Sequence, residues 1–155
     1  MMEEIFNTIF AGDNQQLTDL ISTGVDVNVQ DICGRTPLMH AAIDEKVEMM
    51  ATLIDNGANI DIQDKVGWCA LHFAAQENSY DSCKLLLENN ATVDFQDIHG
   101  NTPLSKAVFN SRGYGEVIEL LRSYGADINL DNNHGVSPLK LANTIANFEV
   151  AQFMK

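Results

Sequence analysis

The sequence predicts an all-α solenoid of stacked helical hairpins, and the main observation behind this prediction is an internal repeat. The segment Asp31–Ala42 returns at 64–75 and at 97–108, and a more diverged copy follows at 132–142. The leading glycines of the four copies stand at positions 34, 67, 100 and 135, so the period is 33, 33 and then 35 residues. A fixed period of this length is typical of stacked, equivalent units and argues against a globule with one closed core.

Each unit is expected to open with a short helix. Thr36 can cap that helix by accepting a hydrogen bond from an exposed backbone N–H group. Pro37 suits the next position because its missing N–H group is not needed there. Leu38, Ala41 and Ala42 then share one face at helical spacing, and the small alanines allow a neighbouring helix to approach closely.

A second helix is predicted near residues 47–55. Met50, Leu53 and Ile54 form its apolar side. Gly57 is expected to end the helix, because glycine adopts the left-handed conformation that follows a helix more easily than other residues. The two helices are expected to pack as an antiparallel pair. Neither pair can bury its apolar faces alone, so stability is expected to come from stacking.

The segment that leads to the next unit is expected to form a projecting, β-hairpin-like finger. An aspartate recurs at the turn of three fingers, where its side chain can accept hydrogen bonds from the backbone of its own turn. An apolar residue within two positions of each aspartate is a second recurring feature, because these turns carry Ile32, Val66 and Ile98 where polar residues are usual. The apolar members either pack between adjacent fingers or bind a partner. The aspartates are Asp31, Asp64 and Asp97.

These residues resemble the ankyrin repeat. That family pairs a Gly-x-Thr-Pro-Leu-His-x-Ala-Ala stretch with a later Leu-Leu-x-x-Gly-Ala-x-x-Asn stretch, and residues 53–61 and 120–129 follow the second pattern. The resemblance covers about residues 15–150 and implies a curved stack of helix pairs with fingers on one side. It divides a single domain, 1–155, into units at about 1–30 (N-terminal cap), 31–63, 64–96, 97–131 and 132–155 (C-terminal cap). The last helix, near Phe148–Met154, is expected to cap the stack only loosely.

The acidic composition narrows the class of partner. The chain has 9 basic and 22 acidic residues and a formal net charge of −13. This balance disfavours nucleic acid and anionic membrane surfaces, which both attract Lys and Arg. A basic protein is the complementary partner, and electrostatic attraction would speed its capture. Because the acids are spread over every unit, a role in solubility alone is the competing interpretation.

The sequence also sets expectations for compartment and cofactors. The start of the chain is acidic, unlike a signal peptide, and no stretch has the length of a membrane span. Three cysteines without paired spacing favour free thiols in the cytoplasm. His99 and His134 occupy matching turns, but no cysteine or carboxylate set completes a zinc site. We expect a cytoplasmic protein with no metal, no cofactor and no enzymatic activity, because no phosphate-binding loop or nucleophile triad is recognisable.

Two departures from the repeat bear on function. Cys69 and Ala70 replace the Thr-Pro pair of the other units, which removes a helix cap worth about 1 kcal/mol. Trp68, the only tryptophan, precedes them at a position that the resemblance implies is exposed. It either contacts a partner or lies over its neighbours as partial core. An insertion at 109–115 places Tyr114 between two glycines on a turn that is expected to be flexible. The insertion either lets Tyr114 and Arg112 reach a partner or is a neutral loop insertion.

The geometry implied by the resemblance places partner contacts on the fingers and on the exposed side of each first helix. Ile43, Trp68 and Phe109 are expected to form a desolvated centre, and Asp44 and Glu77 to pair with Lys or Arg of one partner protein. The free protein is expected to be a monomer. The full set of expected contact residues is Arg35, Ile43, Asp44, Trp68, Gln76, Glu77, His99, Asn101, Phe109, Asn110, Arg112 and Tyr114.

A narrower resemblance concerns residues 100–113 and 132–139. They look like small bacterial ankyrin proteins, some of which are cytosolic immunity proteins that occlude a secreted toxin domain. The acidic charge suits a nuclease toxin with a basic cleft. The alternatives are a cytosolic scaffold or regulator, a bacterial effector that captures a host protein, a hydrolase or nucleotide-binding enzyme, and a self-assembling structural protein.

Overall fold

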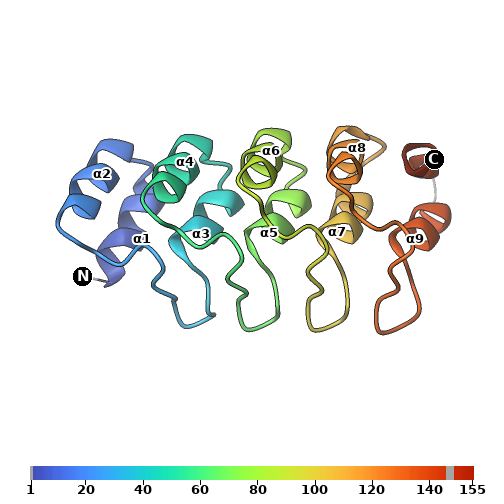
Figure 1. Cartoon of the computed structure of the whole chain (residues 1–155), viewed down its shortest axis with the longest axis horizontal. Helices are drawn as coiled ribbons and strands as arrows, with labels where there is room; N and C mark the ends of the chain where they lie inside the picture. The colour runs from blue at the N-terminus through green and yellow to red at the C-terminus, as the bar shows by residue number, and fades with distance from the viewer. Residues whose placement is uncertain (1, 146–148) are drawn as a thin grey trace.

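The helices of the chain lie in two rows along a stack, as Figure 1 shows. The computed structural model describes residues 2–145 and 149–155. The first helix of each unit belongs to an inner row and the second to an outer row, and the connecting fingers project beyond the inner row. The inner helices are α1 (Met2–Ala11), α3 (Pro37–Ile43), α5 (Ala70–Gln76), α7 (Pro103–Asn110) and α9 (Pro138–Thr144), and the outer helices are α2 (Asn14–Ser22), α4 (Val47–Asp55), α6 (Tyr80–Glu88) and α8 (Glu116–Ser123), followed by a 3-10 helix (Val150–Met154). The predicted all-α solenoid is confirmed.

Side-chain oxygens cap three of the inner helices, as the Thr-Pro pattern predicts. Thr36 accepts a hydrogen bond from the N–H of the third residue of α3 at 3.3 Å, and Thr102 and Ser137 do the same at α7 and α9. At α5 the cap residue Cys69 offers no oxygen. Its own N–H instead donates to Nδ1 of His72 at 3.2 Å, so the backbone at the start of α5 still has a side-chain partner.

The apolar core runs along the whole stack between the two rows. Leu38, Leu71 and Leu104 occupy equivalent inner-helix positions and are fully buried. Ala74 and Ala75 are also fully buried, and their small side chains allow α5 and α7 to pack closely. Each inner helix therefore buries its apolar face against the next unit, which is the physical reason that the units stabilise one another.

The predicted second helix is confirmed as α4, Val47–Asp55. Met50 and Leu53 on its inner side are fully buried. Gly57 follows it with φ +92°, and the equivalent residue after α6, Asn90, has φ +67°. Both positions need the left-handed conformation, which glycine and asparagine adopt at the lowest cost.

The fingers are turns and not β-hairpins, so this part of the expectation is wrong: residues 2–145 and 149–155 contain no β-strand. Neighbouring fingers are joined by single backbone hydrogen bonds instead of a ladder. The N–H groups of Lys65, Ile98 and Asn133 donate to carbonyl groups of the preceding finger at 3.0, 3.0 and 2.9 Å. The side chain of each finger aspartate accepts from its own turn, as predicted. For Asp31 the donors are the N–H groups of Cys33 and Arg35, both at 2.9 Å.

The C-terminal unit packs more tightly than expected. Phe148 lies outside the described residues, but Val150 and Met154 in the 3-10 helix are buried. Arg122 of α8 donates from Nη1 to the carbonyl groups of Phe153 and Lys155 at 2.7 and 2.8 Å. The expectation of a loosely placed last helix is therefore wrong for residues 150–154.

The insertion before α8 is anchored at one end. Gly115 is buried and forms the N-cap of α8. A Cβ atom at this position would lie 2.2 Å from the ring of Phe153, so glycine leaves the space that the aromatic ring fills. Tyr114 before it is 63 % exposed, as expected for a projecting residue. Among the described residues, no helix combines the length and the hydrophobicity that a membrane span requires.

Candidate partner-binding surface

We define the inner surface as the exposed side of the inner helices together with the finger sides that adjoin it. A hollow of about 480 Å³ lies on it between α7 and α9. Four expected contact residues line this hollow: Gln76, Asn101, Phe109 and Asn110. The exposed fraction of Phe109 is 71 %, so most of its ring is available to a partner. The rest of the lining is Ser105, Lys106, Asn132, His134, Val136 and Leu141.

A second hollow of about 460 Å³ adjoins the first and shares Gln76 and Asn110 with it. It lies at the C-terminal ends of α5 and α7, where the insertion projects. Three further expected contact residues line it: Glu77, Arg112 and Tyr114. The structure therefore brings seven of the expected residues onto one continuous region, although their contact with a partner stays a prediction.

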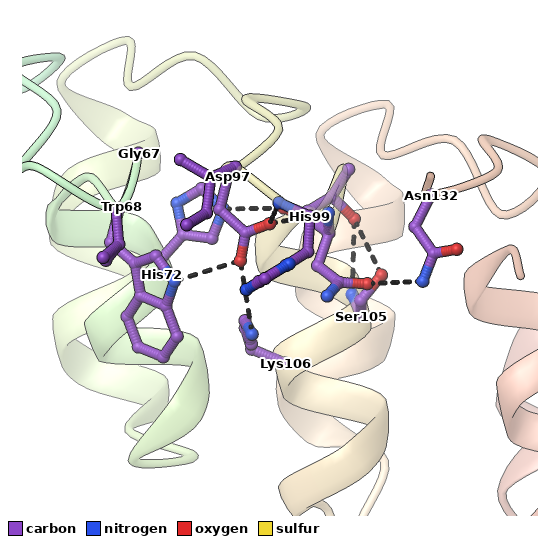
Figure 2. A network of polar contacts seen from close by, with 12 residues as sticks. Gly67, Trp68, His72, Asp97, His99, Ser105, Lys106 and Asn132 are labelled. Atoms are coloured by element: carbon purple, nitrogen blue, oxygen red, sulfur yellow. Dashed lines mark hydrogen bonds and ion pairs between the residues drawn. The ribbon is translucent and has the colours of Figure 1, made fainter. Parts of the chain in front are cut away.

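Trp68 is half-buried and belongs to a polar network between neighbouring units (Figure 2). Its indole Nε1 donates to Oδ2 of Asp97 in the next finger at 3.0 Å. Its ring stacks on His72 with centroids 5.9 Å apart and contacts Phe73 at 4.9 Å. The ammonium group of Lys106 lies 4.4 Å from the ring centroid, within range of a cation–π interaction. The partial-core interpretation therefore accounts for the geometry of Trp68, and the expectation of an exposed indole is wrong.

Asp97 is the centre of this network, and its side chain is fully buried. Its Oδ1 accepts from the N–H groups of His99 and Asn101, both at 2.9 Å. Its Oδ2 accepts from Trp68 and lies 3.4 Å from Nζ of Lys106. Burial alone would raise the pKa of Asp97, but the two backbone hydrogen bonds and Lys106 outweigh it and hold the pKa below the ordinary value.

His72 links the same two units through the backbone. Because Nδ1 accepts from the N–H of Cys69, the proton is on Nε2, which donates to the carbonyl of Asn101 at 3.0 Å. Burial lowers the pKa of His72, which favours this neutral form. The contacts therefore give His72 a structural role between two units.

One unit earlier, Arg35 lies within ion-pair distance of a finger aspartate, although its Nε makes no hydrogen bond within the described residues. Its Nε lies 3.5 Å from Oδ2 of Asp64, and its guanidinium group covers the ring of Phe73 at 5.0 Å from the centroid. In the first full unit, Nε2 of His40 contacts Oδ2 of Asp31 at 2.7 Å. The finger aspartates therefore use the second carboxylate oxygen to hold side chains of the inner surface, and Arg35 is only partly available to a partner.

The other expected residues lie apart from the two hollows. Ile43 is half-buried at the end of α3, and Asp44, exposed, forms an ion pair with Lys46 at 3.4 Å. His99 is exposed on its finger, as are the apolar residues Ile32 at 87 % and Ile98 at 55 %. Packing between adjacent fingers therefore does not cover these two side chains. In the part of the chain that the structure describes, no three His, Cys, Asp or Glu side chains gather as a metal site.

Sequence reasoning missed Phe10 and the six other residues of the first hollow, of which Lys106 is the one that contacts Trp68. Phe10 of α1 is 54 % exposed and stands 33 residues before Ile43, in the register of Gln76 and Phe109. Counting the period back into the N-terminal unit identifies it. Lys106 was missed because its position in the repeat holds a different side chain in each unit, so the pattern does not indicate that it lines the hollow.

The lowered pKa of Asp97 predicts a loss of stability in acid. Because its folded-state pKa lies below the ordinary 3.8, the charged carboxylate stabilises the fold above about pH 4, and this contribution is lost as the pH falls through the folded-state value. Asp31, whose pKa is also lowered although burial opposes this, adds to the effect. Urea unfolding between about pH 5 and pH 3 should show a falling free energy of unfolding, with a shallower fall in Asp97→Asn. An equal fall of the free energy of unfolding with pH in both proteins would contradict a stabilising role of the charged Asp97 carboxylate.

Comparison with known protein families agrees with the repeated helical fold. A family model described as "Ankyrin repeats (3 copies)" matches residues 6–97, and a model described as "Ankyrin repeat" matches residues 99–133. The two matches together cover most of the chain, including α7 and its finger. No curated protein matches the sequence.

Proposed function

The chain belongs to the ankyrin-repeat family, whose repeats indicate a protein–protein interaction module, and on this premise we propose that the inner surface binds one basic partner protein. The observation that carries the proposal is the continuous region formed by the two hollows, which gathers Phe109, Tyr114 and Glu77 along the ends of α5 and α7. Exposed aromatic side chains beside hollows are typical of interface centres. The surface is fixed by inter-unit hydrogen bonds, so binding would involve little ordering cost.

The placement of acids at helix ends supports a basic partner. Asp44 and Glu77 are the C-cap residues of α3 and α5. A carboxylate at a helix C-terminus is unfavourable for the fold, since that end carries partial negative charge, whereas a Lys or Arg of a partner would be attracted to both charges. Glu77 is exposed and has no ion pair within residues 2–145 and 149–155.

A charge reversal tests this proposal. The wild-type protein should capture a partner from the native lysate. This partner should bind Glu77→Lys about tenfold more weakly than the wild type. It should bind Glu119→Lys, a matched change on the outer helix α8, as tightly as the wild type. The association rate with Glu77→Lys should be slower and should depend less on salt, as surface plasmon resonance would show. Equal binding to the two variants would place the interface elsewhere.

The partner can be a toxin domain that the inner surface occludes. Two features support this form of the function: residues 100–113 and 132–139 resemble small bacterial ankyrin proteins, and the chain is acidic. Co-expression with a toxin from a neighbouring gene distinguishes the alternatives. Restored growth together with a one-to-one complex supports immunity. A complex without rescue of growth favours a scaffold or an effector, and concentration-dependent self-association in sedimentation would favour a structural assembly.

A further inference from the structure

One row of side chains crosses four units of the inner surface. Phe10, Ile43, Gln76 and Phe109 each stand at the C-terminal turn of an inner helix and follow one another at the period of 33 residues. We call this row the anchor strip. Its two end members are exposed phenylalanines, 54 % and 71 %, whereas Ile43 and Gln76 between them are half-buried. The strip therefore offers two separate apolar contacts and not one continuous apolar patch.

The middle of the anchor strip is acidic. The residues directly after Ile43 and Gln76 are Asp44-Glu45 and Glu77, and all three side chains are exposed. Lys46 does not neutralise them fully, because one ammonium group faces three carboxylates and forms an ion pair with Asp44 at 3.4 Å. The C-terminal ends of α3 and α5 add partial negative charge at the same place.

The hollow beside Phe109 suits an apolar side chain. Part of its polar lining is already hydrogen-bonded, because Asn132 donates from Nδ2 to Oδ1 of Asn101 at 2.9 Å and accepts from its own turn through Oδ1. The remaining lining includes Val136 and Leu141, which are half-buried and apolar. A hydrocarbon or aromatic group would bury this surface without displacing a hydrogen bond.

From these features, and resting on the proposed function, we infer that the anchor strip recognises a basic segment with two apolar anchors: one side chain in the hollow at Phe109, one against Phe10, and a Lys or Arg between them facing Glu77 and Asp44. Phe10 and Phe109 are three inner helices apart along the stack. At the ordinary spacing between packed helices, this corresponds to a distance of about 25–30 Å. The anchors are therefore about eight or nine residues apart in an extended segment, or about eighteen in a helical one.

The single tryptophan supplies a local signal for occupancy of the hollow. Lys106 lines the hollow and its ammonium group lies 4.4 Å from the ring of Trp68. A side chain that enters the hollow changes the surroundings of this cation, and Trp68 emission should shift. Contact with Phe10 alone, which stands two units before Trp68, should leave the emission unchanged.

A display library of random 24-residue peptides, selected on the whole protein, tests the inference. Enriched peptides should carry two apolar residues at one of the two spacings with Lys or Arg between them. Synthetic copies should shift Trp68 emission and should bind Phe10→Ser and Phe109→Ser each about tenfold more weakly, as fluorescence titration would show. Tyr80→Ser on the outer helix α6, also an exposed aromatic, should bind like the wild type.

The outcomes separate this inference from the proposed function. Selected peptides that bind both phenylalanine variants as well as the wild type, but lose affinity for Glu77→Lys, overturn the two-anchor reading and leave the inner surface as the interface. Peptides without basic residues also overturn it. Peptides whose binding depends on Tyr80 and not on Glu77 overturn both the two-anchor inference and the proposal that the inner surface is the interface.

Discussion

Asp97→Ala is expected to lower the free energy of unfolding by about 3 kcal/mol, among the largest effects of any single side chain in the stack. The carboxylate is fully buried and accepts hydrogen bonds from His99, Asn101 and Trp68. Its removal leaves these donors without a partner and leaves the ammonium group of Lys106, whose side chain is 18 % exposed, without its counter-charge. Urea denaturation followed by circular dichroism measures the loss.

Two variants control this experiment. Asp97→Asn keeps the acceptor for the backbone N–H groups, as Asn132 does in the next finger, but presents an amide to Trp68 and Lys106. It should lose less than Asp97→Ala, about 1–2 kcal/mol. Asp131→Ala breaks an exposed ion pair with Lys140 and should cost less than about 0.5 kcal/mol. A loss in Asp97→Ala no larger than in Asp131→Ala would mean that the network does not stabilise the stack.

Gly67→Ala is expected to cost more than about 2 kcal/mol, because two independent penalties coincide at one finger. Gly67 has φ +82°, which an L side chain rarely adopts. A Cβ atom there would also lie 2.9 Å from Cα of Asp97 and 3.0 Å from the backbone N of Ile98, so the next finger would have to move as a whole. Thermal unfolding should show a lower Tm.

Gly135→Ala is the matched control for the finger contact. Gly135 occupies the equivalent position in the last finger with φ +73°, but no atom of the described residues lies within 4 Å of the Cβ position. Only the backbone penalty applies there, about 1 kcal/mol. The difference between the two variants measures how tightly neighbouring fingers pack. Equal losses would contradict the close stacking of the fingers.

The repeat made the fold predictable from the sequence. The Thr-Pro caps, the second helix at 47–55 and the left-handed residues after it are local features, and each depends on side chains within a few positions. The finger conformation was predicted less well. β-Hairpin-like fingers were expected, whereas each finger is a turn that contributes a single inter-finger backbone hydrogen bond.

The side chains of the candidate site were harder to place, because their partners come from the next unit. Trp68 looks exposed in a single repeat, and only the structure shows Asp97, 29 residues later, accepting from its indole. Arg35 depends in the same way on Asp64 and Phe73. Phe109 was easier to place, because it lies on the exposed side of its own helix, and its exposed fraction of 71 % agrees with the expectation.

Hydrogen–deuterium exchange of the protein, free and bound to its captured partner, tests the central claim most directly. If the inner surface is the interface, protection on binding should concentrate at the C-terminal ends of the inner helices and in the insertion, at 43–46, 76–79 and 109–114. The outer helices α4 and α6, at 47–55 and 80–88, should exchange as in the free protein. Protection confined to the outer row, with the inner-helix ends unchanged, would contradict the account.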